Sequence, residues 1–245
     1  MKPFRLLAMA LFFLALAGPA LALTPQELEV QGKLLAEFLV TGRGVVAQSL
    51  PKYDINNAAI GDKGFTPQLF AQEINAQFKA STGIDIAAGK TSTPLPGNTL
   101  ELLSTLLEAS RQVCADNQLL INMSGVGFKG FIPATYGKMV GDIFREKTGI
   151  TLKQTSLRFR NAYNAPDTFE KSMLTKMESP GYPQGQAVVQ PEGGNFRMMR
   201  PVYIQKACLS CHGDPKGELD VAGRKKEGYR DGELRGAISV LIPAK

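Results

Sequence analysis

The chain has 245 residues, a formal net charge of +6, three cysteines, one histidine and no tryptophan. This length suits one large domain or two small ones. The positive excess is mild and spread along the chain, so we expect no nucleic-acid partner, and the single histidine excludes any site that needs two imidazole ligands.

Residues 1–22 have the pattern of a secretory signal peptide. Lys2 and Arg5 precede an apolar run at 6–17, and Ala-Leu-Ala at 20–22 supplies a cleavage site. The apolar run is too short to favour a stable membrane span, although an uncleaved anchor is the alternative. We therefore expect export, most simply to a bacterial periplasm, and no membrane span after signal removal.

The predicted helices mostly precede the predicted strands. Thr24 with Glu27 is a capping-box start for the first helix, and Asp167 with Glu170 is another for the fifth. We expect helices at about 24–48, 67–80, 98–116, 133–147 and 167–177, and strands at about 152–160, 186–190, 196–204 and 237–242. This order predicts an α+β fold with an antiparallel sheet and a helical N-terminal layer.

The helical layer contains a degenerate duplication. Lys-Gly-Phe-Thr-Pro at 63–67 matches Lys-Gly-Phe-Ile-Pro at 129–133, and each is followed by a helical stretch that ends in Thr-Gly-Ile. Further upstream, 33–43 resembles 101–111, and the first copy has Val46 where the second has Cys114. We therefore divide the chain into the signal peptide, a helical repeat copy at 23–97, and a segment at 98–245 that carries the second copy.

Near the C-terminus, Cys208-Leu209-Ser210-Cys211-His212 is a CxxCH motif, typical of covalent c-type haem attachment. Each thiol would add to a haem vinyl group, and His212 would ligate the iron from the proximal side. A redox dithiol and half a zinc site are the alternatives for a CxxC pair. A four-ligand zinc site would need the distant Cys114, and a thioredoxin-type pair normally lies early and opens a long helix. We therefore predict one covalent haem c.

Several segments around this motif resemble one bacterial family. Leu152–Asn161, Asn164–Glu170, Ala207–Pro215 and Arg235–Val240 are similar, in order, to the periplasmic mono-haem c-type cytochrome domains of PAS-like fold. These domains occur alone or as input domains of sensor kinases and chemoreceptors. The resemblance covers roughly residues 100–243. It implies a PAS-like antiparallel sheet at 98–245, haem on one face, and redox or small-ligand sensing.

The same resemblance implies that a cysteine from an upstream helix is the second axial ligand, and the matching position is Cys114. The chain departs from many family members just after it, with Asp116-Asn117-Gln118 where an Ala-Pro pair is common. Cys114 falls on an apolar stripe of the predicted helix, so a buried core cysteine is the alternative. Other candidates for the sixth position are water, an open site and the methionines Met123, Met139, Met198 and Met199.

Four arginines are candidates for pairing with haem propionates, because a guanidinium matches a carboxylate bidentately: Arg158, Arg160, Arg197 and Arg200. Ordinary structural arginines are the alternative. We predict an exported mono-haem cytochrome for one-electron transfer or redox sensing with a redox partner protein, and a homodimer is compatible with the sequence. A module that senses a small diatomic ligand is the alternative. A peroxidase-like enzyme is disfavoured, because the chain has no distal histidine.

Overall fold

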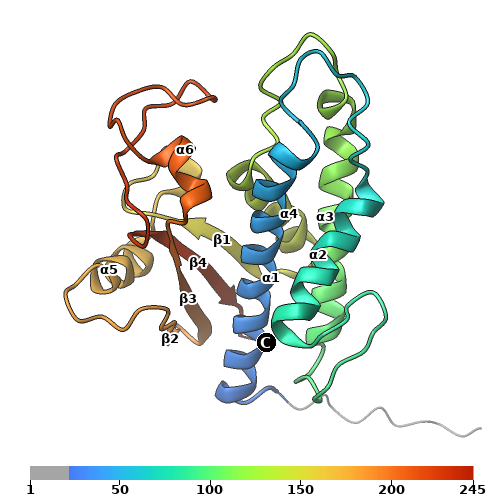
Figure 1. Cartoon of the computed structure of the whole chain (residues 1–245). Helices are drawn as coiled ribbons and strands as arrows, with labels where there is room; N and C mark the ends of the chain where they lie inside the picture. Colours follow the sequence, from blue (N-terminus) through green and yellow to red (C-terminus); the bar gives the residue numbers. More distant parts are fainter. Residues whose placement is uncertain (1–21, 245) are drawn as a thin grey trace, which may run out of the picture.

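The computed structural model describes residues 22–244, so the predicted signal peptide lies outside the described residues except for its last position. The helices are α1 (Pro25–Lys52), α2 (Pro67–Thr82), α3 (Thr99–Ile121), α4 (Pro133–Thr148), α5 (Thr168–Met177) and the single turn α6 (Leu209–His212), with 3-10 turns η1 (Ala162–Asn164) and η2 (Lys206–Cys208). The strands are β1 (Thr151–Thr155), β2 (Val188–Glu192), β3 (Asn195–Tyr203) and β4 (Leu234–Ile242). The predicted α+β class is confirmed (Figure 1). Among these residues, no helix combines the length and apolar character needed to cross a bilayer.

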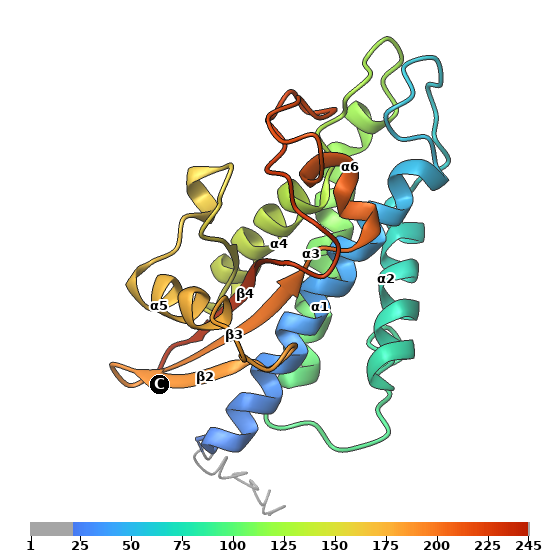
Figure 2. The same ribbon diagram turned by 60° about the vertical axis from the view of Figure 1, so that its left-hand side comes forward.

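The four strands form one antiparallel sheet in the order β1-β4-β3-β2. Helices cover both faces: α1 and α4 pack on one, and α5 packs on the other (Figures 1 and 2). Met198 and Met199, neighbours on β3, mark the two faces. Met198 belongs to the core beneath α1 and α4, whereas Met199 packs in the smaller cluster with Phe169 and Leu174 of α5.

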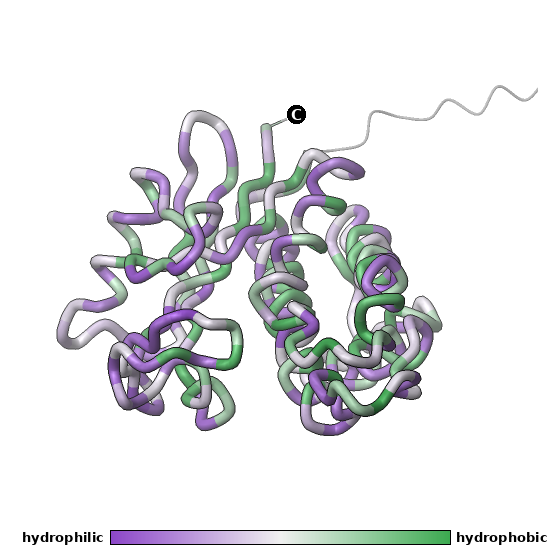
Figure 3. The backbone as a smooth tube through the Cα atoms, turned by 90° about the horizontal axis from the view of Figure 1, so that it is seen from above, coloured by the Kyte–Doolittle hydropathy of each residue, from purple (hydrophilic) through white to green (hydrophobic). Residues whose placement is uncertain are grey.

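The helical layer continues away from the sheet. Here α1 contacts the sheet on one side and α2, α3 and α4 on the other. Seen from above, the helices and the sheet with its loops form two groups side by side, and green and purple segments alternate along the helices (Figure 3). One apolar core joins residues from both sides of position 97. The predicted domain boundary there stays a prediction.

Two equivalent hydrogen bonds join the loops of the two repeat copies. The backbone N–H of Lys63 donates to Oδ1 of Asn122 at 3.2 Å, and the backbone N–H of Lys129 donates to Oδ1 of Asn56 at 3.0 Å. The Nζ of each lysine also donates back to its own loop, to two carbonyl oxygens for Lys63 and one for Lys129, and both side chains are buried. Each duplicated loop is therefore hydrogen-bonded to the other copy in the same way.

Several element boundaries differ from the sequence prediction. Helices α1 and α3 run past the predicted ends at 48 and 116, because their last turns carry the buried residues Ser49 and Ile121. The extended segment predicted to reach 160 pairs with β4 only as far as Thr155. Beyond it, Ser156 donates its hydroxyl to the carbonyl of Arg235 at 2.7 Å, and the chain turns.

Two glycines allow the helices to lie close to their neighbours. A Cβ on Gly141 of α4 would lie 2.3 Å from the carbonyl oxygen of Leu152 on β1. A Cβ on Gly42 of α1 would lie 2.1 Å from the hydroxyl oxygen of Tyr136 on α4. Both distances are shorter than van der Waals contact, so only glycine permits these approaches. The C-terminal half of α1 is thereby fixed against α4 beside the sheet.

Candidate functional site

The CxxCH segment, residues 208–212, lies beyond one end of the sheet and beside the C-terminal half of α1 (Figures 1 and 2). It forms the end of the 3-10 turn η2 and all of α6. The side chains of Cys208, Cys211 and His212 are half-buried, and both thiols are free. Two thiols and one imidazole are therefore presented from a single stretch of turns.

His212 is held through both its backbone and its ring. Its carbonyl oxygen accepts a hydrogen bond from the backbone N–H of Tyr229 at 2.9 Å, and its Nδ1 lies 3.0 Å from Oε2 of Glu227. A carboxylate can only accept, so Nδ1 carries the hydrogen and Nε2 keeps its lone pair. Metal-ligating histidines are oriented in this way. Burial, and then the nearby Arg235, lower the pKa of His212.

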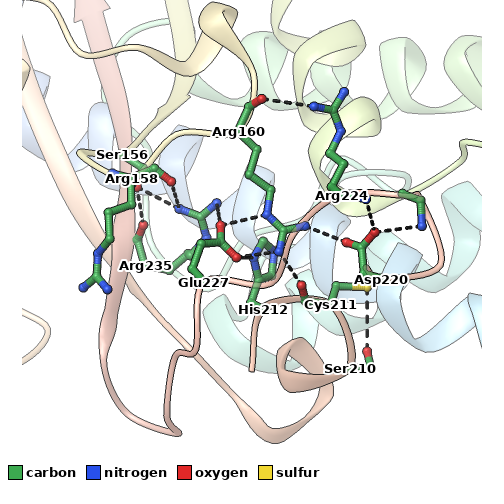
Figure 4. Close-up of polar contacts among 11 residues, drawn as sticks. Ser156, Arg158, Arg160, Ser210, Cys211, His212, Asp220, Arg224, Glu227 and Arg235 are labelled. Carbon is green, nitrogen blue, oxygen red and sulfur yellow. Dashed lines mark hydrogen bonds and ion pairs between the residues drawn. The ribbon is translucent and has the colours of Figure 1, made fainter. Parts of the chain in front are cut away.

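Arg160 connects the carboxylates around the segment (Figure 4). Its guanidinium donates to Oδ2 of Asp220 at 2.6 Å and to both carboxylate oxygens of Glu227 at 2.8 and 2.5 Å. It also donates to the carbonyl oxygen of Cys211. The Asp220 side chain is 2% exposed, so this pairing is largely removed from water. Arg160 thus fixes the backbone of the motif and the carboxylate that holds His212.

Two more arginines contact residues of this cluster: Arg235 reaches the carboxylate itself, and Arg158 contacts Tyr229. Arg235 donates to the hydroxyl of Ser156 at 2.7 Å and to Glu227 at 3.4 Å. The guanidinium of Arg158 lies over the ring of Tyr229, 4.2 Å from its centre. Burial alone would raise the pKa of Glu227, but hydrogen bonds from Arg160 and His212 outweigh it and lower that pKa. Glu227 is therefore an ionised acceptor at neutral pH.

Sequence reasoning singled out Arg158 and Arg160 but missed Asp220, Glu227, Tyr229 and Arg235. No local signal indicates the role of Glu227, because it directly follows the basic run at 224–226, a pattern typical of a solvated loop. Arg235 belongs to one of the family-like segments, but its local sequence does not connect it to the motif. The partners of Arg160 lie 60 and 67 residues away along the chain, so spacing could not connect them.

Arg197 and Arg200 lie away from this cluster. Arg197 of β3 pairs with Asp167 at 2.8 Å and with Glu192 at 2.7 Å, beside α5. Arg200 pairs with Glu37 of α1 at 2.5 Å. The described residues thus already supply carboxylates for both guanidiniums.

Cys114 lies on α3, and α1 separates α3 from α6 (Figures 1 and 2). Its side chain is 0% exposed within the helical core, and burial raises the pKa of its thiol to about 12. The methionine candidates are scattered. Met198 and Met199 are buried on opposite faces of β3, Met139 packs beside the helical core, and Met123 is 41% exposed.

The donor set fits a covalently attached haem. Two unpaired thiols with two residues between them can form two thioethers, and the adjacent imidazole offers its Nε2 with Nδ1 already held by a carboxylate. A four-ligand zinc site of cysteine and histidine would need Cys114, which lies behind α1, and the described residues contain no group of three or more Cys, His, Asp or Glu side chains placed to hold a metal ion. The geometry of the CxxCH segment therefore favours haem over zinc.

Comparison with known proteins gives one family and one solved structure. Residues 24–243 match the family model described as Tll0287-like. The chain is also similar to a solved structure described as the crystal structure of the cyanobacterial heme-protein Tll0287, with 24% identity and a TM-score of 0.41. The match covers 58% of this chain and 95% of that one. No match was found among curated proteins.

Proposed function

This chain belongs to the Tll0287-like family, and from that premise we propose that it is an exported mono-haem c-type cytochrome that transfers single electrons or senses redox state. The observation that carries the proposal is the CxxCH segment, with two free thiols and with the Nδ1 of His212 bound to Glu227. This is a covalent attachment site joined to a pre-oriented iron ligand.

Each residue of the site has a defined role in this proposal. Cys208 and Cys211 would hold the haem, and His212 would ligate its iron through Nε2. Glu227 keeps the proton on Nδ1, while Arg160 holds Glu227 and the carbonyl of Cys211. When bound, the haem supplies an iron that takes up and releases one electron. Because Glu227 holds the His212 ring at Nδ1, the imidazole would move little when the charge on the iron changes. A small reorganisation of this kind suits electron exchange.

The proposed partner is a redox protein that docks near the motif. Cys208, Cys211 and His212 are only half-buried, so a haem bound there would lie close to the surface. The proposed compartment is the periplasm, on the basis of the predicted signal peptide. A ligand-sensing role remains an outcome of the test below.

The test is production of the full chain, with its own signal, in a bacterial host that attaches haem c outside the cytoplasm. We expect an intact mass equal to the processed chain plus one haem, a Soret band, and reversible one-electron oxidation and reduction. The Cys208→Ala/Cys211→Ala variant, processed in the same way, should lack the added mass. A wild-type mass equal to the bare processed chain, with no Soret absorption, would refute the proposal.

Carbon monoxide separates the two roles. A ferrous spectrum that resists carbon monoxide indicates a fixed sixth ligand and supports electron transfer or redox sensing. Ready formation of a carbon monoxide adduct supports ligand sensing instead.

A further inference from the structure

The hairpin at 213–228 continues from the CxxCH segment and returns to it. Its two arms are joined by backbone hydrogen bonds and by a bridge that pairs Leu219 with Lys225. Its return is fixed to the motif, because the backbone N–H of Tyr229 donates to the carbonyl oxygen of His212 at 2.9 Å. A surface on this hairpin therefore lies next to the proposed iron ligand.

The hairpin exposes two large apolar side chains, and a third lies on the segment that is bound to it. Leu219 is 61% exposed and Val221 is 60% exposed. They flank Asp220, whose carboxylate pairs with the guanidinium of Arg160 at 2.6 Å. Phe159, which directly precedes Arg160, is 44% exposed. Three exposed apolar side chains thus belong to two segments that one ion pair holds together, and apolar exposure of this kind is typical of an interaction surface.

Exposed cations accompany these apolar side chains. Three cations of the hairpin take part in no ion pair among residues 22–244: Lys216, Arg224 and Lys225. The bridge places Lys225 directly opposite Leu219, and residues opposite each other on antiparallel strands project to the same face. The guanidinium of Arg224 donates to the carbonyl oxygen of Arg160 at 3.1 Å, which holds it against the segment that carries Phe159 (Figure 4). Cationic and apolar side chains therefore share one surface.

The acids of the hairpin do not offset these cations. Three of them are engaged in ion pairs with Lys226 or with Arg160: Glu218, Asp220 and Glu227. Asp214 is exposed and has no ion pair within the described part of the chain, so three uncompensated cations stand against one uncompensated acid. A positive surface with exposed apolar side chains is complementary to an acidic face of another protein.

We propose that an acidic redox protein docks on this surface, which comprises Phe159, Lys216, Leu219, Val221, Arg224 and Lys225. The inference rests on the proposed function, because the haem held by the motif is the redox centre that the partner approaches. In each encounter one electron crosses between the haem iron and the redox centre of the partner, so that one is oxidised as the other is reduced, and no bond or proton is transferred. Opposite charges speed the encounter, and the apolar side chains are covered when the complex forms.

The experiment measures how fast reduced flavodoxin, an acidic one-electron donor protein, reduces the oxidised haem-loaded chain in a stopped-flow spectrometer. Lys225→Glu is compared with Lys90→Glu, which makes the same change of net charge at an exposed lysine between α2 and α3. That loop lies towards the other end of the molecule from α6 (Figures 1 and 2). We expect Lys225→Glu to react about tenfold more slowly at low ionic strength, and Lys90→Glu to stay close to wild type. The difference should disappear at about 1 M salt, where the charges are screened.

The apolar part of the surface is tested by Leu219→Ser, with Val30→Ser as the control. Val30 is 44% exposed on α1, near its N-terminal end. We expect Leu219→Ser to weaken the complex about fivefold at low and at high salt, as read from the saturation of the rate with flavodoxin concentration. Its Soret band and reduction potential should match wild type. A shift in either one would show that Leu219 covers the haem itself, and it would overturn the docking surface.

Equal rates for Lys225→Glu and Lys90→Glu would overturn the inference, because the whole chain is basic and its net charge alone would then account for the reaction. A wild-type rate that rises with ionic strength would also overturn it, because the surface would then repel an acidic protein. Failure of the proposed function looks different, because the wild-type chain itself would then carry no haem.

Discussion

The Nδ1 atom of His212 lies 3.0 Å from Oε2 of Glu227, and the same carboxylate accepts from Arg160. A carboxylate in this position makes a metal-bound imidazole more basic and places a negative charge near the metal. Both effects favour the oxidised iron.

The first prediction concerns this carboxylate. Glu227→Gln keeps the shape of the side chain but removes its charge, so we expect the reduction potential of the haem-loaded protein to rise. The measurement is an optical redox titration. Glu218→Gln, which removes the acid from the ion pair with Lys226, is the control and should leave the potential unchanged, because Glu218 is 55% exposed. A potential that falls in Glu227→Gln would contradict the role assigned to this residue.

The second prediction concerns acid stability through Asp220. Burial alone would raise the pKa of Asp220, but backbone hydrogen bonds from Arg224 and Ala222 and the contact with Arg160 lower it below its ordinary value. A lowered pKa in the folded state stabilises the protein fully above the unfolded pKa of about 3.9, and the effect is lost as the pH falls towards the folded value. Wild type should therefore lose melting temperature steeply below about pH 4.

The variant Asp220→Asn lacks this titration. We expect it to be less stable by about 2–3 kcal/mol at pH 7, roughly 5–10 °C in melting temperature, with a flatter acid limb. Calorimetry between about pH 3 and pH 7 is the measurement, because ordinary carboxyl groups titrate near the lower end of this range and are fully ionised at its upper end. Asp116→Asn, at an exposed position, should follow the wild-type curve. If melting temperature fell with pH in the same way for wild type and Asp220→Asn, the titration of Asp220 would not contribute to acid stability.

The third prediction concerns the approach of α4 to β1. In Gly141→Ala the new methyl group would lie 2.3 Å from the backbone carbonyl of Leu152, which cannot rotate away. We expect a loss of at least about 2 kcal/mol, or roughly 4–8 °C in melting temperature.

Gly44→Ala on α1 is the matched control, because a Cβ there would have nothing within 4 Å. It should be stabilised by about 0.5–1 kcal/mol through helix propensity alone. Equal melting temperatures for the two variants would show that α4 can shift on the sheet.

Local signals predicted the elements of this chain well. The capping boxes at Thr24 and Asp167 are present, and Gly83 and Gly149 both adopt φ of 75° at the ends of α2 and α4. These features depend on residues three or four apart, which is why sequence alone reveals them.

The surroundings of the motif could not be predicted in the same way. The CxxCH segment is contiguous, so the sequence reveals it, but Glu227 reaches it only through the folded backbone. The basic run before Glu227 looks like a solvated loop because nothing local shows that Arg160 will pack against it.

The fourth prediction concerns Cys114, which stays a candidate for the sixth iron ligand. It is matched by Val46 in the other repeat copy, and both side chains are 0% exposed in the helical core. Because α1 separates α3 from the motif, we expect Cys114→Ala to leave the optical and EPR spectra of the haem unchanged. The cost should be about 1–2 kcal/mol of stability, comparable to that of Val46→Ala, because each substitution opens a small cavity.

A shifted Soret band and loss of thiolate features in Cys114→Ala, with a wild-type spectrum in Val46→Ala, would instead establish Cys114 as the ligand. In that case α3 must approach the motif more closely than it does in this structure.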